Sequence, residues 1–247
     1  MTGAAFPSRA MVLAAGRGQR MRPLTDACPK PLLPVAGRTI LDHSLDKLAA
    51  FGIEAAVVNC SYLGAQIVDH LASRTVPPAI LSPEDSPLET GGGVRNALDH
   101  LGDAPFFVIN GDSLWIDGVK DTLHRLATAW DPERMDIQLL MQSMARVVGE
   151  TARGDFLMDG DGRLTRRPEQ EMASFCYTGV SIVHPRVFAD CPDGAFSMNL
   201  LYDRAEAAGR LFGWAHDGPW YHLSNPDDLT RAETMFARGH RLDTPYL

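Results

Sequence analysis

The sequence contains few cysteines and no long apolar run. Its four cysteines are scattered over 247 residues without a C-x-x-C pair, so the pattern indicates neither a zinc site nor a disulfide framework. No apolar run approaches membrane-spanning length, and residues 1–9 lack the apolar region of a signal peptide. We therefore expect a cytoplasmic protein without a membrane partner, in which residues 1–9 form a loose lead-in.

An excess of basic charge and two familiar phosphate-binding patterns are also missing. The formal net charge of −8 argues against nonspecific nucleic-acid binding. The string Gly-x-x-x-x-Gly-Lys-Ser/Thr of P-loop enzymes does not occur. The dinucleotide fingerprint fails because Met21 stands where its third glycine belongs, which excludes a dehydrogenase of that type.

What the sequence does contain is a cation-rich glycine loop directly after an apolar run. Residues 10–15 predict a buried strand, and the following loop contains Gly16, Gly18 and Arg20, with Lys30 shortly after it. Glycines allow backbone N–H groups to close around phosphate oxygens, and cations neutralise the phosphate charge. The segment therefore predicts a polyphosphate site.

Strand-like and helix-like patterns alternate along the first half of the chain. The predicted strands are residues 10–15, 53–59, 79–81 and 105–110, and the predicted helices are residues 39–51, 62–73 and 93–101. The second half predicts strands at 135–144 and 175–183, a hairpin at 155–164, and helices at 196–208 and 225–238. This alternation is typical of a largely parallel sheet covered on both faces.

We predict an α/β fold, a single-domain Rossmann-like three-layer sandwich with a mixed, mostly parallel central sheet. Residues 10–247 form this domain; residues 10–130 are its nucleotide-binding half, and residues 131–247 supply the pocket of a second substrate. Ligands of such sheets bind at the carboxyl ends of the strands.

A carboxylate follows the predicted strand at residues 105–110. Asp112 comes directly after Asn110 and Gly111, and the simplest interpretation of such a triplet is a turn. Because Asp112 lies at the end of a buried strand, in the same half as the phosphate loop, we favour a metal site. Mg²⁺ prefers oxygen ligands of this kind and keeps several waters.

Residues 13–25 read Leu-Ala-Ala-Gly-x-Gly-x-Arg-Met-x-Pro-Leu-Thr, and Pro-Lys-Pro follows at residues 29–31. This string resembles the signature of the sugar-1-phosphate nucleotidyltransferases. Segments 87–93, 101–106, 153–156 and 177–181 most resemble the N-acetylmuramate-1-phosphate uridylyltransferases of cell-wall recycling, with mannose-1-phosphate guanylyltransferases as the alternative.

The resemblance implies the nucleotide-diphospho-sugar transferase fold and a metal-dependent reaction between a nucleoside triphosphate and a sugar-1-phosphate. The resemblance to the uridylyltransferases implies UTP as the nucleotide and N-acetylmuramate-1-phosphate as the sugar phosphate. The sugar phosphate attacks the α-phosphorus and pyrophosphate leaves, with Arg20, Lys30 and Asp112 as catalytic residues. The segment 87–94, whose three glycines at 91–93 lie where the predicted helix begins, would face the nucleobase. The implied nucleotide-binding residues are Leu13, Ala14, Ala15, Gly16, Gly18, Lys30, Glu84, Glu89, Thr90, Gly91 and Asn110.

For the sugar phosphate, Arg166 and Arg167 occupy the place of the basic residue of many relatives, although both could be exposed hairpin charges. Arg153 is another candidate on the same side. The implied sugar-phosphate residues are Gly154, Asp155, Arg167, Thr178 and Gly179.

One position departs from the family pattern. His222 stands where relatives have the second aspartate ligand of Mg²⁺. Either His222 binds the metal, with more tolerance of Mn²⁺, or another carboxylate such as Asp217 replaces it, or the site is weakened. We favour Asp112 and His222 as the metal ligands. A non-catalytic nucleotide-sugar-binding protein is the alternative from another class, and the protein is expected to be a monomer or a dimer.

Overall fold

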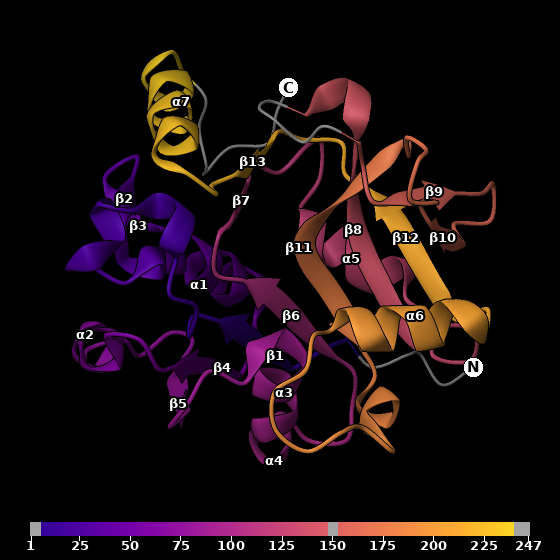
Figure 1. Cartoon of the computed structure of the whole chain (residues 1–247), viewed down its shortest axis with the longest axis horizontal. Helices are drawn as coiled ribbons and strands as arrows, with labels where there is room; N and C mark the ends of the chain where they lie inside the picture. Colours follow the sequence, from indigo (N-terminus) through magenta and orange to yellow (C-terminus); the bar gives the residue numbers. More distant parts are fainter. Residues whose placement is uncertain (1–5, 148–152, 240–247) are drawn as a thin grey trace.

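The first predicted strand, β1, lies near the centre of a nine-stranded sheet in the computed structural model (Figure 1). The structure describes residues 6–147 and 153–239, so residues 1–5 of the expected lead-in and residues 148–152 and 240–247 of the predicted domain lie outside the described residues. The strands of this sheet are β1 (Arg9–Leu13), β4 (Ala55–Cys60), β5 (Ala79–Pro83), β6 (Phe106–Asn110), β8 (Ile137–Ser143), β9 (Phe156–Met158), β10 (Leu164–Arg166), β11 (Phe175–Val183) and β12 (Leu211–Ala215).

The sheet is mixed and mostly parallel, as predicted. Its strand order is β10-β9-β11-β6-β1-β4-β5, with β8 paired to β11 and β12 beyond β8. The strands β5, β4, β1 and β6 are parallel neighbours, and only β11 and β10 run against the others. The long strand β11 therefore joins the nucleotide half to the second half within one sheet.

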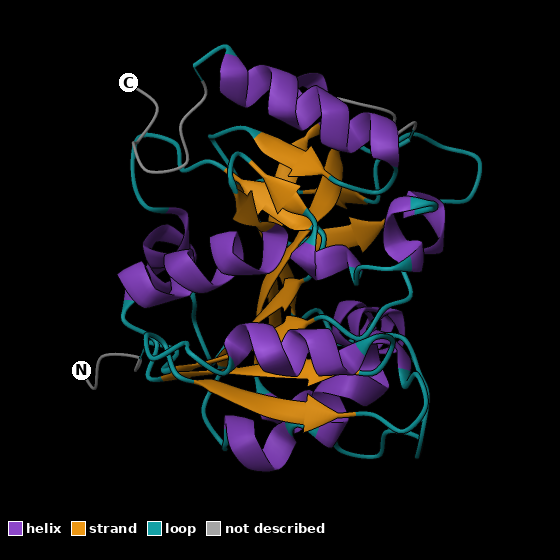
Figure 2. Ribbon diagram, turned by 90° about the vertical axis from the view of Figure 1, so that its left-hand side faces the viewer, coloured by secondary structure: helices purple, strands orange, loops and turns teal. Residues whose placement is uncertain are grey.

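Helices cover both faces of the sheet (Figure 2). Along β1, Ala10 and Val12 pack into one apolar cluster and Met11 into another, all fully buried. Burial on both faces explains why this strand is a continuous apolar run. The α-helices are α1 (Ile40–Phe51), α2 (Gly64–Leu71), α3 (Glu89–Asn96), α4 (Leu98–Leu101), α5 (Thr122–Ala129), α6 (Asn199–Ala207) and α7 (Pro226–Ala237), and the 3-10 helices are η1 (Gln19–Met21), η2 (Leu24–Asp26), η3 (Lys30–Leu32), η4 (Met144–Arg146) and η5 (Pro185–Phe188).

Two helix starts follow the capping chemistry of the sequence. The Thr39 side chain accepts a hydrogen bond from the backbone N–H of Asp42 at the start of α1. At α7, Asn225 and Asp228 form a reciprocal capping box. These caps explain why both predicted starts were close to the observed ones.

The three consecutive glycines lie inside helix α3, which begins at Glu89, so the prediction that Gly91 and Gly92 precede a helix starting at Gly93 was wrong. A Cβ on Gly91 would lie 2.4 Å from the Phe196 ring, and one on Gly92 would lie 2.4 Å from the Gly194 carbonyl oxygen. The Gly91 and Gly92 N–H groups also donate to the Phe196 carbonyl at 2.8 and 3.0 Å. Gly91 and Gly92 thus allow the segment before α6 to pack against the helix, whereas a Cβ on Gly93 would lie 2.8 Å from Asn59 Nδ2 and from Glu84 Oε1.

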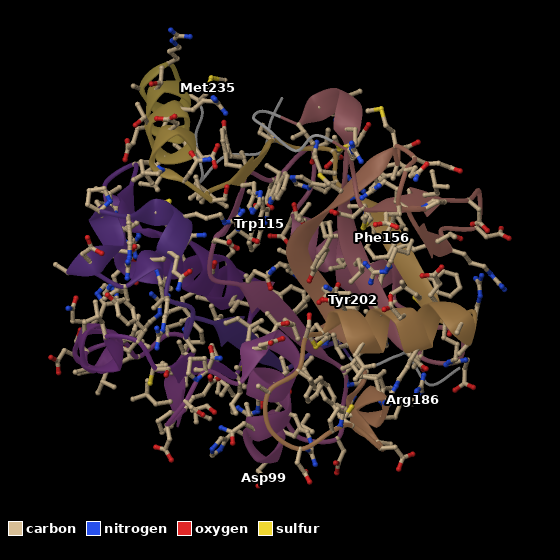
Figure 3. The ribbon with its side chains drawn as sticks, viewed as in Figure 1. Asp99, Trp115, Phe156, Arg186, Tyr202 and Met235 are labelled. Atoms are coloured by element: carbon tan, nitrogen blue, oxygen red, sulfur yellow. The ribbon has the colours of Figure 1, made fainter. Side chains whose placement is uncertain are left out.

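Two small ribbons were not predicted. β2 (Pro34–Val35) pairs with β3 (Arg38–Thr39), and β7 (Ser113–Trp115) pairs with β13 (Trp220–His222). Strands this short carry too little periodicity to be recognised in the sequence. Trp115, labelled in Figure 3, is buried in the second ribbon. None of the described helices is long and apolar enough to cross a membrane.

Candidate active site

A cavity of about 500 Å³ opens at the carboxyl ends of β1, β4, β5 and β6. Every predicted nucleotide-binding residue except Gly91 lines it, as do Arg20 and Asp112. Asn59, the next-to-last residue of β4, also lines the cavity, in line with its place as a polar residue at the end of a predicted buried strand. Sequence reasoning missed Ser224, which follows β13 and reaches the cavity only through the fold.

A buried hydrogen-bond chain crosses the floor of this cavity. The Ala14 N–H donates to Asn59 Oδ1 at 2.6 Å, and Asn59 Nδ2 donates to Glu84 Oε1 at 2.6 Å. The Leu88 N–H donates to Glu84 Oε2 at 3.0 Å. Both oxygens of Glu84 are therefore engaged within the protein, and this chain ties the phosphate loop to the start of α3.

Lys30 and Asp112 meet at the mouth of the cavity. Lys30 Nζ donates to Asp112 Oδ2 at 2.8 Å. Burial opposes ionisation of Asp112, yet the pKa of its carboxyl lies below the usual value because the charge and the hydrogen bond of Lys30, together with the nearby His222 and Arg20, outweigh burial. The two residues are 82 positions apart in sequence, and the fold creates this pair.

Gly111 holds Asp112 against the first loop. Its N–H donates to the Leu13 carbonyl oxygen at 2.9 Å, and a Cβ at this position would lie 2.3 Å from that oxygen. Only glycine allows this approach. The carboxylate therefore sits beside the end of β1, as the strand-end argument predicted.

His222 reaches the same place from the far end of the chain. In the β13–β7 ribbon it pairs with Ser113, and its Nε2 lies 4.0 Å from Asp112 Oδ2. Its ring stacks on Trp220, with centroids 5.5 Å apart and planes 12° apart. The structure thus brings the two predicted metal ligands together.

Asp217 does not replace His222 in this arrangement. Its carboxylate forms an ion pair with Arg125 and fits against Gly118, where a Cβ would collide with it. Within residues 6–147 and 153–239, no group of three or more His, Cys, Asp and Glu side chains could hold a metal. Asp112 and His222 form a pair, so water and phosphate oxygens would have to complete the coordination of a bound ion.

A second cavity, of about 210 Å³, shares His222 with this arrangement. Its other lining residues are Arg153, Gly154, Asp155, Cys176, Tyr177 and Trp220. Two of the predicted sugar-phosphate residues, Gly154 and Asp155, therefore line a cavity that reaches the Asp112–His222 pair.

The other three predicted sugar-phosphate residues have structural roles in this conformation. The Arg167 guanidinium donates to four backbone carbonyls, those of residues 154, 168, 169 and 171. Thr178 is 1% exposed and its hydroxyl donates to the Leu140 carbonyl at 2.9 Å. Gly179, with φ +85°, leaves room for the Ser113 hydroxyl. Spacing along the chain could not reveal these contacts, because all of them depend on tertiary packing.

The family of the chain follows from comparison with known proteins. The model of the MobA-like NTP transferase domain matches residues 10–189. The chain belongs to this family. The N-acetylmuramate alpha-1-phosphate uridylyltransferase of Caulobacter vibrioides is 43% identical over 236 residues, which cover 94% of this chain and 98% of that protein. The enzyme of the same name from Neisseria meningitidis serogroup B is 33% identical over 232 residues, 92% of this chain and 97% of its own length.

Solved structures agree on the fold. A UDP-glucose pyrophosphorylase complexed with UDP-glucose superimposes with a TM-score of 0.78 over 94% of this chain and 99% of its own, at 15% identity. The predicted nucleotide-diphospho-sugar transferase fold and membership of the sugar-1-phosphate nucleotidyltransferases are confirmed. The chain is therefore an enzyme, and the non-catalytic alternative is set aside.

Proposed function

We propose that this NTP transferase moves a uridylyl group from UTP to N-acetylmuramate α-1-phosphate and releases pyrophosphate. The observation that carries the proposal is the meeting of two cavities at Asp112 and His222. One cavity holds the cation-rich glycine loop, and the other opens beside residues 153–155. The activities of the two bacterial uridylyltransferases support this choice of substrates, and a role in cell-wall recycling in the cytoplasm stays a prediction.

The residues of the larger cavity suit an in-line displacement. An oxygen of the sugar phosphate forms a bond to the α-phosphorus of UTP, while the bond from that phosphorus to the leaving pyrophosphate breaks. Lys30 and Arg20 supply positive charge where phosphate charge accumulates, and the backbone of the glycine loop supplies N–H donors. Such a reaction needs positioning and charge neutralisation, and no protein nucleophile.

We also propose Mg²⁺ as the metal, with Asp112 and His222 as its protein ligands. A carboxylate oxygen and an imidazole nitrogen 4.0 Å apart are close enough to reach one ion after small side-chain movements, and Mg²⁺ usually keeps several waters. When bound, the ion neutralises phosphate charge. The imidazole also favours acceptance of Mn²⁺.

His222→Ala tests this metal site. We expect the Mg²⁺ concentration for half-maximal activity to rise at least about ten-fold, and Mn²⁺ binding measured by electron paramagnetic resonance to weaken in parallel. An unchanged metal requirement and unchanged Mn²⁺ binding would remove His222 from the metal site.

A substrate panel tests the function. Pyrophosphate release is followed with UTP, GTP, dTTP and CTP against the 1-phosphates of N-acetylmuramate, N-acetylglucosamine, glucose and mannose. We expect the highest kcat/KM with UTP and N-acetylmuramate α-1-phosphate. A preference for GTP with mannose-1-phosphate would instead assign the guanylyltransferase activity, and absence of turnover with every pair would refute the proposal.

A further inference from the structure

We propose that Arg153 binds the lactyl carboxylate of the sugar substrate and so selects N-acetylmuramate over N-acetylglucosamine. The inference rests on the proposed function, because only that substrate class carries a carboxylate besides its phosphate. Arg153 lines the 210 Å³ cavity that ends at His222. Among the residues that the structure describes, its guanidinium has no hydrogen-bond or ion-pair partner.

Several other polar groups of this cavity are already engaged. Asp155 Oδ2 accepts from the Tyr177 N–H at 2.8 Å, and the Tyr177 hydroxyl donates to Ser181 at 3.2 Å. The Trp220 indole N–H donates to the Thr178 carbonyl at 3.0 Å. Among the described lining residues, Arg153 is therefore the permanent cation that is free to bind a ligand.

The backbone of Arg153 lies beside the start of β11, whereas the metal ligands lie beside a later part of the same strand. The Ala173 N–H, just before β11, donates to the Arg153 carbonyl at 2.8 Å. Five residues further along, the Thr178 carbonyl accepts from the Ser113 hydroxyl at 2.6 Å, next to Asp112. Ala173 and Thr178 are five residues apart in sequence, so the Arg153 backbone and the Asp112 side of the site contact different parts of this stretch.

This separation assigns the two anionic groups of the substrate to different ends. The phosphate must lie near Asp112, because its oxygen attacks the α-phosphorus of the nucleotide. The sugar ring then extends along β11, and its carboxylate faces the guanidinium of Arg153. Arginine binds a carboxylate through two parallel N–H donors, which gives orientation as well as attraction.

The local backbone is shaped for this approach. Gly154 has φ +68°, and a Cβ there would lie 2.5 Å from the Ala173 carbonyl oxygen. Glycine thus lets the Arg153 segment run directly against the start of β11. Arg167 is not an alternative cation, because its guanidinium donates to four backbone carbonyls.

Arg153→Gln is the decisive variant, with Arg153→Lys as the conservative one and Arg238→Gln, on the exposed end of α7, as the matched control. kcat/KM is measured with UTP for N-acetylmuramate- and N-acetylglucosamine-1-phosphate. Loss of a hydrogen-bonded charge pair should lower kcat/KM for the N-acetylmuramate substrate about ten- to a hundred-fold. The value for the N-acetylglucosamine substrate should stay within about two-fold, and lysine should restore part of the loss.

Three other results would overturn the inference. An equal loss with both sugars would mean that Arg153 binds the phosphate or supports the cavity. No loss with either sugar would remove it from the site, and a large fall in thermal midpoint would point to a structural role. A wild-type enzyme that uses neither sugar would refute the proposed function itself, whereas an active wild type with an unchanged variant would refute only the role of Arg153.

Discussion

Glu84→Gln should break the buried hydrogen-bond chain under the nucleotide cavity. A double variant that exchanges the amide and the carboxylate between positions 59 and 84 should restore it. Both side chains are almost fully buried, at 2% and 7% exposure. Glu84 only accepts, from Asn59 Nδ2 and from the Leu88 N–H. In Glu84→Gln, one of these donors must face a new NH₂ group, so a buried hydrogen bond is lost without any change in size.

The expected cost follows from the chemistry of that bond. A hydrogen bond to a charged group contributes about 1.5–3 kcal/mol, and a buried donor left unpaired costs about as much. We therefore expect Glu84→Gln to lower the free energy of unfolding by about 2 kcal/mol. Because the chain joins Ala14 to the start of α3, KM for UTP should rise while KM for the sugar phosphate changes little.

The double variant Asn59→Asp/Glu84→Gln should recover both properties. The new carboxylate at position 59 can accept from the Ala14 N–H and from the new amide at position 84, whose oxygen still accepts from the Leu88 N–H. Asn59→Asp alone should be the most damaging, since two carboxylates would then face each other at 2.6 Å.

Urea unfolding and steady-state kinetics on the four proteins form a double-mutant cycle, with the exposed Glu133→Gln as control. We expect a favourable coupling of at least about 2 kcal/mol. A double variant no better than Glu84→Gln, or a Glu84→Gln protein indistinguishable from the control, would refute the reasoning.

Three further predictions concern other parts of the molecule. Gly111→Ala should lower the free energy of unfolding by more than about 2 kcal/mol in urea titrations, because its Cβ would lie 2.3 Å from a backbone oxygen, whereas Gly160→Ala, with nothing within 4 Å, should be nearly neutral. Burial raises the pKa of Cys176 to about 12, so mass spectrometry should find this thiol unmodified by a disulfide reagent at pH 8 in the folded protein; rapid labelling would contradict this. The lowered pKa of Asp112 stabilises the folded protein at pH values above the pKa of the unfolded chain, about 3.9. This contribution is lost as the pH falls through the folded pKa. The difference in unfolding free energy between wild type and Lys30→Met should therefore be largest near neutral pH and shrink in acid, and a difference independent of pH would contradict the ion pair.

The sequence by itself determined the layers of this protein and one wall of its site. The apolar run of β1 predicts a strand buried on both faces, and the glycines and cations after it predict the phosphate loop. The caps at Thr39 and Asn225 also predict where two helices begin. These are local patterns, in which each residue acts on near neighbours in the chain.

Only the tertiary structure decided which of the predicted side chains are free to act. Arg167 and Thr178 match the expected positions, but backbone carbonyls from elsewhere in the fold occupy their donors. Arg153 keeps its guanidinium unpaired within the described part of the chain, and His222 reaches Asp112 through a ribbon of two three-residue strands. Pairing between residues that are far apart in sequence, such as Asp112 and His222, depends on tertiary packing. The local pattern of either segment therefore cannot predict it.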